Sequence, residues 1–574
     1  MIQTVRRIAT RAVPLEELGA PDRARSLYRA GVAAAIALGV LIRVLHVLAT
    51  DFPLNDGGMF YAMVRDIQSA GYRLPDFTSY NRLNIPFTYS PLAFYLAAIV
   101  DDLTPLDLFD VLRLLPLVGT SLTMGAFFLL ARSILSSRRE VVAAVFAFAV
   151  LPTTFIYPIM GGGLTRSFGF LFAILALHQA WLLYTRRSWR YVPLATLFCA
   201  LTVLSHLGTA PFLAYGIAFF FLARGRHWHG LISSLVVAVG TLVISAPWWA
   251  TVFARHGADP FLAAKASGGA AMLLSLVVDL LRLNLGATWE PFFPVLLTLT
   301  LVGTFISLAN GRFLLPAWWA VILLTESRAT ALLSSLPIAM LAGVGVVEGL
   351  LPFLLRVRTD PARVENGMGA RLRNRRSPAW VPLLVLGFLV GNASLAALAP
   401  LRKHPSALVG AGRSLQSLSP EERTAMRWVA EETPADSRFL IITGNGWEPR
   451  TGWAWGAQSG WADDRVSEWF PVLANRPSVG TVQGTEWFPD NVFALSAQNY
   501  DAAQRCANWT ANCLDAWSAE AGRPFTHVYI PKSPFVHRDP NTQCCQTLLA
   551  SLREDSRYAR VYDGPGAVIF ARVR

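Results

Sequence analysis

Charged side chains are scarce in this sequence: Asp, Glu, Lys and Arg make up only 15% of its 574 residues. Soluble domains are closer to roughly one quarter charged, so the shortage argues against a wholly water-soluble protein. Hydrophobic residues make up 53% of the chain and the mean hydropathy is +0.42. Such a chain needs lipid as part of its solvent, which predicts a multi-pass membrane protein.

The sequence also lacks a recognisable cleavable signal peptide. Its first apolar run begins near residue 30, after a polar and basic segment, and no typical small-residue cleavage site is present. We therefore expect residues 1–29 to lie in the cytoplasm and the first apolar run to act as a signal anchor.

Long apolar stretches predict an all-α membrane domain at 30–399, with about 11 transmembrane helices, followed by a soluble mixed α/β domain at 400–574. A membrane-spanning helix needs about 20 residues. The two shortest stretches, 210–223 and 313–325, need flanking residues or a thinner bilayer. The stretches are 30–49, 109–133, 141–157, 167–184, 192–208, 210–223, 230–252, 291–309, 313–325, 330–352 and 379–399.

Basic residues are concentrated in alternate connections between these stretches. Short cytoplasmic loops retain positive charge, so these connections are expected inside, whereas the acidic first loop at 50–108 and the C-terminal domain are expected outside. We place the protein in the plasma (inner) membrane of a bacterium or archaeon. The basic connections contain Arg6 to Arg29, Arg138 and Arg139, Arg186 to Arg190, Arg224 and Arg226, Arg312, and the run Arg356 to Arg376.

The net charge of +13 lies entirely in the membrane part, because the residues after 400 carry equal numbers of basic and acidic side chains. This distribution follows from the orientation rule, so the pI near 9.9 does not indicate a nucleic-acid partner.

Cysteine is rare, and four of the five cysteines lie in the expected external domain, where disulfides persist. Because a bond between sequence neighbours is strained, we expect Cys506 and Cys513 either to bond to each other or each to bond to one of Cys544 and Cys545. The spacing lacks paired CxxC units, which argues against a metal site.

The first loop is longer than the roughly 15 residues that a simple connection needs, which indicates function. Its segment 91–100 is apolar but short, and predicts a helix at the membrane surface. Residues 51–67, DFPLNDGGMFYAMVRDI, combine a turn around Asp56 with an amphipathic helix from Met59 to Ile67. Asp56 is thus expected at the boundary between water and lipid. The alternative is that it only caps the following helix.

Several of these features together resemble the GT-C superfamily of membrane glycosyltransferases. They are the carboxylate shortly after the first span, the long first loop with surface helices, the Ser90-Pro91-Leu92 step, and Arg113 at the start of the second span. This superfamily includes the aminoarabinose transferase, protein O-mannosyltransferases and the catalytic subunit of oligosaccharyltransferase. The resemblance implies a polyprenyl-phosphate sugar donor, with Asp56 as the general base and Asp51 as the reserve candidate.

A departing lipid phosphate requires fixed cations, preferably Arg. The candidates are Arg113, Arg328 beside Glu326, and Arg166, which follows three glycines whose amides can cradle an anion. Lys265 and His206 are further candidates. For each arginine, the alternative to phosphate binding is that its side chain extends from the helix end to water and lipid head groups.

Carboxylates are absent from YPIMGGGLTRS, residues 157–167, whereas oligosaccharyltransferase catalytic subunits use acidic residues in the corresponding second external loop. Hard oxygen ligands for a divalent cation are therefore few, although Glu326 or Asp279 could contribute. We expect no obligatory cofactor, with Mg²⁺ or Mn²⁺ as the alternative.

The last part of the chain predicts an α/β domain, with a helix from Pro420 to before Thr433 and strands beginning near 439, 526 and 567. Tryptophans alternate with charged residues between 447 and 487, a mixture that suits sugar binding; the alternatives are that they anchor the domain at the head groups or fill its core. The candidate contacts to an acceptor or glycan are Trp469, Trp487, Glu468 and Arg476.

We predict a glycosyltransferase that moves a sugar from a polyprenyl-phosphate donor to a glycan, lipid or protein acceptor on the external face, with membrane lipids around it. The alternative is a transporter or lipid flippase. Transporters place ionisable groups near the bilayer midplane, whereas most of those here lie at the outer rim. Arg43 and His46, on one face of the first span, are the exceptions.

Overall fold

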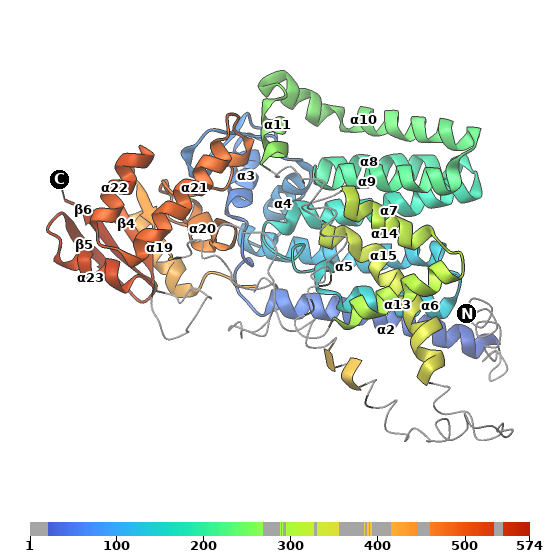
Figure 1. Ribbon diagram of the computed structural model, residues 1–574. Coiled ribbons are helices and arrows are strands. Elements are labelled where there is room, and N and C mark those ends of the chain that lie inside the picture. The colour runs from blue at the N-terminus through green and yellow to red at the C-terminus, as the bar shows by residue number, and fades with distance from the viewer. Residues whose placement is uncertain are drawn as a thin grey trace.

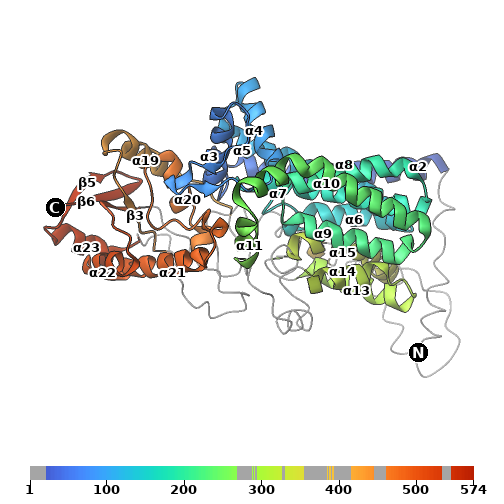
Figure 2. The same cartoon turned by 90° about the horizontal axis from the view of Figure 1, so that it is seen from above.

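The computed structural model describes most of the chain, in two parts that lie end to end (Figures 1 and 2). Long helices lie side by side in one part, and the C-terminal strands and helices gather at one end of them. The described residues are 21–267, 288, 290, 294–325, 330–354, 384, 387–389, 391–392, 415–444, 460–532 and 544–573.

A helix overlaps ten of the eleven predicted stretches, and the eleventh, 379–399, lies almost wholly outside the described residues. Five helical segments, beginning at residues 23, 108, 163, 228 and 332, are long and apolar enough to cross a membrane. The chain is therefore polytopic. The bundle helices are α2 (Pro21–Leu48), α5 (Leu108–Ile134), α6 (Arg138–Val150), α7 (Gly163–Arg186), α8 (Val192–Ser205), α9 (Thr209–Phe220), the π-helical η5 (Phe221–Gly225), α10 (Trp228–His256), α11 (Asp259–Ala266), α13 (Val295–Ala309), α14 (Leu314–Thr325), α15 (Thr330–Val344) and the π-helical η6 (Gly345–Leu350).

Arg43 of α2 is fully buried in the bundle and is satisfied by neighbouring segments. Its guanidinium donates to the Gly39 carbonyl at 2.8 Å and to Oγ1 of Thr154 at 2.9 Å. It also donates to Oγ1 of Thr120 in α5 at 3.3 Å and lies over the Phe155 ring. A charge inside a membrane domain persists only where such partners replace water, so Arg43 joins α2 to its neighbours.

The first loop folds into two helices and a small hairpin. The helices are α3 (Gly58–Ser69) and α4 (Leu92–Leu103), and they confirm the two helices predicted in this loop. Strands β1 (Phe77–Thr78) and β2 (Ile85–Pro86) pair antiparallel around η2 (Tyr80–Arg82). The apolar face of α3 packs on α4, with the Phe60 and Phe94 rings edge to face at 5.0 Å.

The C-terminal part is built on a four-stranded sheet of order β3-β4-β6-β5, in which β3 and β4 are parallel and the other pairs antiparallel. The predicted helix from Pro420 and the predicted strands are confirmed, including the capping box of Ser419 and Glu422. β5 is a strand that the sequence analysis does not identify. The elements are α19 (Pro420–Glu432), β3 (Phe439–Ile441), η8 (Gly460–Asp463), α20 (Arg465–Leu473), η9 (Thr485–Trp487), α21 (Val492–Arg505), η10 (Cys506–Asn508), α22 (Asn512–Ala521), β4 (His527–Pro531), α23 (Gln546–Glu554), β5 (Tyr558–Asp563) and β6 (Ala567–Arg572).

Strands β3, β4 and β6 are buried on both faces, and their alternate residues belong to two different cores. Leu440, Val528 and Phe570 share a core with Leu514 of α22 and Leu548 of α23. The opposite face belongs to the hydrophobic core that continues through α19, α20 and α3 into the helix bundle. The C-terminal part is therefore packed onto the first loop as well as tethered to it by the chain.

All four cysteines of the C-terminal part form disulfides, as Cys506–Cys513 and Cys544–Cys545. The first bond is one of the two predicted pairings. The sequence analysis disfavours a bond between neighbours, and that expectation is wrong. The two sulfurs meet where Cys545 adopts a left-handed backbone conformation, φ 69°, at the turn before α23.

Arg476 is buried at the end of α19 rather than placed on a surface. Its guanidinium donates to the carbonyls of Pro434 at 2.8 Å and Ala430 at 3.1 Å, and also to that of Thr433. These carbonyls lie at a helix end and in the loop after it, where they have few other donors. The structure therefore gives Arg476 a role in packing.

Replacing Arg476 with Ala should lower the free energy of unfolding by about 2–3 kcal/mol, because buried carbonyls lose charge-assisted hydrogen bonds. The thermal unfolding midpoint of purified protein in detergent measures this effect. Arg553→Ala, which removes an exposed arginine of α23, is the control and should leave the midpoint unchanged. Equal midpoints for the two variants would contradict the packing role.

Candidate functional site

Asp56 is held against the segment that leads into α7. Its Oδ1 accepts a hydrogen bond from the backbone N–H of Gly162 at 2.9 Å. The adjacent N–H of Gly161 donates to the Leu54 carbonyl at 2.9 Å. The N-cap of α3 is Gly57, and α3 has no side-chain cap. Asp56 thus binds the segment before α7. It does not cap its own helix, so the capping alternative from the sequence is wrong.

Helix α20 covers the same turn from the C-terminal part. Oε1 of Glu468 accepts from the Gly57 N–H at 2.8 Å, and the Trp469 indole N–H donates to the Asn55 carbonyl at 3.0 Å. The Tyr80 hydroxyl donates to the Glu468 carbonyl at 2.7 Å. The residues on both sides of Asp56 are therefore fixed by contacts from a segment more than 400 residues away in the sequence.

Glycine is required where these segments meet. A Cβ at Gly58 would lie 2.5 Å from the Glu468 carbonyl oxygen. One at Gly161 would lie 2.1 Å from the Asp56 carbonyl oxygen, and one at Gly162 would lie 2.4 Å from Oδ2 of Asp56. No side chain fits at such distances. The glycine pairs of the two loops therefore let the backbones approach around the carboxylate.

Burial raises the pKa of Glu468 well above its ordinary range, and the nearby charge of Asp56 raises it further. The N–H groups of Gly57 and Gly58 act in the opposite direction without cancelling the shift. Glu486 adds a smaller repulsion from η9. Glu468 therefore holds a proton at pH values where a water-exposed glutamate is ionised.

Arg166 is the predicted cation that the structure brings to this site. It lies in the first turn of α7, four residues after Gly162, and its guanidinium packs over the Tyr157 ring and donates to the Tyr157 carbonyl at 3.3 Å. Its charge also acts on the buried Tyr89 of the first loop. A positive charge therefore lies at the same helix end that binds Asp56.

Of the other cation candidates, Arg113 lies near enough for its charge to act on Asp51, and His206 lies near Arg166. Arg113 pairs with Asp110 at 2.6 Å, one turn earlier in α5. Lys265 is exposed on α11, and His206 is bonded to Oγ1 of Thr209 at 2.7 Å. The candidates Arg328 and Glu326, and also Asp279, lie outside the described residues.

The remaining aromatic candidates are buried in packing contacts. The Trp487 ring meets the Tyr89 ring edge to face at 4.9 Å. The Trp469 ring meets Phe52 in the same way at 4.8 Å. Both tryptophans thus join the C-terminal part to the first loop, which matches the alternative that they fill a core.

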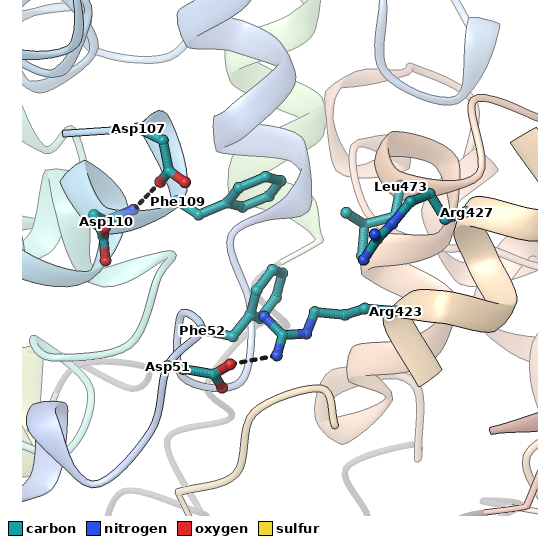
Figure 3. A pocket seen from close by; sticks show the side chains of 8 residues that line it. All are labelled: Asp51, Phe52, Asp107, Phe109, Asp110, Arg423, Arg427 and Leu473. Carbon is teal, nitrogen blue, oxygen red and sulfur yellow. Dashed lines mark hydrogen bonds and ion pairs between the residues drawn. The ribbon is translucent and has the colours of Figure 1, made fainter. Parts of the chain in front are cut away.

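A cavity of about 300 Å³ lies beside this junction (Figure 3). Arg423 pairs with Asp51 at 2.5 Å, lowers the pKa of that carboxyl, and lies over the Phe52 ring. Arg423 and Arg427 both line the cavity and lie one helical turn apart in α19. Their helical spacing was the signal in the sequence that could have identified them. The lining residues are Asp51 and Phe52 of the first loop, Asp107, Phe109 and Asp110 at the start of α5, and Arg423, Arg427 and Leu473 of the C-terminal part.

Among the described residues, no three His, Cys, Asp or Glu side chains are grouped so that they could hold a metal ion.

Comparison with solved structures shows the fold. The mycobacterial arabinofuranosyltransferase AftD matches 95% of this chain and 40% of its own length, with 15% identity and a TM-score of 0.52. This chain has the GT-C fold. That confirms the resemblance in the sequence, and since the identity is low it concerns the fold and not the activity.

Two further GT-C structures match over most of the chain. AglB, the oligosaccharyltransferase of Archaeoglobus fulgidus, was solved with an inhibitory peptide and a dolichol-phosphate; the match has 14% identity, covers 88% of this chain and 69% of AglB, and has a TM-score of 0.48. ArnT from Cupriavidus metallidurans, solved with undecaprenyl phosphate, matches at 14% identity over 94% of this chain and 98% of its own, with a TM-score of 0.48. No protein-family model matches the sequence, and no curated protein matches it.

The protonated state of Glu468 predicts a pH-dependent effect of Glu468→Gln. A carboxyl whose pKa is raised in the folded protein destabilises the folded state as the pH rises above its unfolded value of 4.5 towards the folded value. Glutamine does not ionise, so the variant is not destabilised in this way. The difference in unfolding midpoint, variant minus wild type, should therefore increase as the pH is raised from about 5 to 8.

Thermal unfolding of both proteins across this pH range measures the difference. Glu421→Gln, at an exposed position in the first turn of α19, is the matched control and should give a constant difference. A difference that also stays constant for Glu468→Gln would show that Glu468 is ionised in the folded protein.

Proposed function

We propose that this protein is a membrane glycosyltransferase that takes a sugar from a polyprenyl-phosphate donor, with Asp56 as the general base. The observation that carries the proposal is that two distant segments fix the Asp56 turn at the end of the helix bundle: the entry to α7 binds the carboxylate, and α20 binds the backbone on both sides of it. The GT-C fold supports it. Packing alone does not need a carboxylate at such a junction, whereas catalysis requires a base held in one position.

In the proposed step, the acceptor hydroxyl attacks the anomeric carbon of the donor sugar. Its proton passes to the Asp56 carboxylate, a new bond forms between the acceptor oxygen and the anomeric carbon, and the bond to the lipid phosphate breaks. The phosphate leaves with the electron pair of that bond. Asp56 has one oxygen bonded to the Gly162 N–H, so its other oxygen is the one assigned to the acceptor proton.

Arg166 is the proposed partner of the departing phosphate. It lies at the N-terminus of α7, where the helix dipole and a guanidinium favour negative charge together. Arg113 is a weaker candidate because Asp110 already neutralises it. Arg328 stays a candidate from the sequence.

The cavity beside the Asp56 turn suits a hydroxyl-rich acceptor. The three carboxylates and two guanidiniums that line it provide acceptors and donors of hydrogen bonds, beside the side chains of Phe52 and Phe109. The Trp469 ring contacts Phe52, and its Cζ2 would lie 3.0 Å from a Cβ at Gly57. An acceptor placed there lies close to the proposed base, and it is a glycan, lipid or protein that carries such groups.

The orientation is proposed from the charge distribution. The first loop 50–108 and a C-terminal domain at 400–574 face outward, residues 1–29 lie in the cytoplasm, and about 11 helices at 30–399 span the plasma membrane. The loop ends remote from the C-terminal part contain Arg138, Arg186, Arg224 and Arg312, as this orientation requires.

The proposed step needs no metal, and a dependence on Mg²⁺ or Mn²⁺ is the alternative. Turnover after dialysis against a chelator distinguishes the two, because only a metal-dependent enzyme would lose activity and regain it when the cation is returned.

Asp56→Asn should reduce turnover by at least about a hundredfold, the usual effect of losing a general base. The asparagine oxygen can still accept the Gly162 N–H, so the turn is preserved while the basicity is lost. Release of lipid phosphate from a panel of polyprenyl-phosphate sugars measures turnover.

Asp66→Asn is the matched control, because Asp66 also lies in the first loop and accepts a backbone N–H, that of Ser79 at 2.9 Å. Its turnover should stay within about twofold of wild type. Equal turnover of Asp56→Asn and wild type would exclude Asp56 as the base, and wild-type protein inactive with every donor would favour transport.

Cysteine labelling tests the orientation. Leu103→Cys, at a position 80% exposed at the end of α4, should react with a membrane-impermeant maleimide in intact cells. Arg187→Cys, in the connection after α7, should react only after the cells are opened. The native cysteines are buried or disulfide-bonded, so they give little background. The reverse pattern would invert the topology and remove the proposed catalytic site from the external face.

A further inference from the structure

A second and larger hollow lies at the opposite end of the helix bundle from the C-terminal part. Its volume is about 670 Å³, and it is formed by the last turns of α5 and α7, the π-helical η5 and the start of α10. Five arginines line it, which are Arg132, Arg186, Arg187, Arg224 and Arg226. His227 lies at its edge, and none of the residues that line it is an aspartate or glutamate.

These five guanidiniums have no partner among the described residues. None of them forms a hydrogen bond or ion pair there, although other arginines at this end do. Arg312 is paired with Glu348, and Arg190 is bonded to the Tyr191 hydroxyl at 2.5 Å. The orientation rule explains why arginine is common in these connections. It does not explain why five unpaired arginines surround one hollow.

Local backbone contacts fix the two connections that border this hollow, one after α7 and one between η5 and α10. His227 caps α10, because its Nδ1 accepts the Gly230 N–H at 2.9 Å. A Cβ at Gly230 would lie 2.2 Å from the Gly225 carbonyl oxygen, so η5 and α10 meet closely. Across the hollow, Arg187 ends α7 in a left-handed conformation, φ 50°. These turns present arginines from two connections to the same space.

Apolar side chains adjoin the arginines. Leu222, which lines the hollow, is 62% exposed, and Trp228 and Leu231 at the start of α10 are 74% and 50% exposed. Tryptophan is enriched at the level of lipid head groups, and exposed leucine beside it is suited to acyl chains. The hollow therefore lies where a lipid head group meets the protein.

We propose that this hollow binds the head group of an anionic phospholipid. Arginine offers a planar fork of donors that matches phosphate oxygens, and the absence of lining carboxylates gives the site a net positive charge. The exposed apolar residues beside it contact the acyl chains and distinguish a lipid from a free phosphate ion. The site is separate from Asp56 and does not depend on the proposed glycosyl transfer.

Lipid retention tests the proposal. Full-length protein is reconstituted into vesicles of equal parts phosphatidylglycerol and phosphatidylethanolamine and extracted in mild detergent, and its bound lipid is measured by mass spectrometry. Wild type should retain phosphatidylglycerol at least about tenfold over phosphatidylethanolamine. The variant Arg186→Gln/Arg187→Gln/Arg224→Gln should lose this preference, because each arginine charge raises the affinity for an anionic head group about fivefold.

Arg138→Gln/Arg139→Gln is the matched control, since it removes two arginines at the same end of the bundle but outside the hollow, and it should keep the wild-type preference. Arg132→Gln/Arg226→Gln gives a second test if the triple variant is poorly folded. An equal loss in the control, or no preference in wild type, would overturn the proposal. So would release of the lipid by inorganic phosphate but not by chloride of equal ionic strength, which would indicate a site for the free ion.

Discussion

The close approach of three backbone segments around Asp56 is the constraint on which the rest of this end of the molecule depends. Gly58 leaves room for the Glu468 carbonyl, and Gly161 and Gly162 leave room for Asp56. The hydrogen bonds that these contacts permit run between the first loop, the entry to α7 and α20. A side chain at any of these glycines would separate the segments, and the carboxylate would lose its fixed position.

The apolar core strengthens the same junction. One cluster of buried residues continues from the bundle through Phe60 and Met63 of α3 to Trp469 and Phe470 of α20, and on to one face of the sheet. Burial of apolar area provides most of the stability of such a contact, while the hydrogen bonds at Asn55 and Gly57 determine its register. The C-terminal part therefore completes the site around Asp56, because it supplies one wall of the turn and one wall of the neighbouring cavity.

Local patterns in the sequence predicted the elements well and the contacts between them poorly. The capping box at Ser419, the apolar periodicity of α3 and the long apolar run of α7 depend on residues that are close in sequence, so they are visible without a structure. The pairing of Glu468 with Gly57 and the cavity between Phe109 and Arg427 depend on segments hundreds of residues apart. The disulfide of Cys544 and Cys545 was disfavoured because a bond between sequence neighbours is strained. The left-handed conformation of Cys545 that accompanies it is not marked by a glycine in the sequence.

Two buried ionisable side chains, Arg43 and Glu468, bear on the choice between the proposed enzyme and a transporter. A transport cycle needs ionisable groups within the membrane that exchange partners. Arg43 lies inside the bundle, but its donors are bound to Gly39, Thr120 and Thr154 at contacts that fix neighbouring helices. Glu468 is buried where the bundle meets the C-terminal part, and burial together with the nearby charge of Asp56 raises its pKa. The Arg43 guanidinium is thus used for packing within the bundle, whereas the Glu468 carboxyl lies beside the proposed base, an arrangement that suits the proposed glycosyl transfer better than transport.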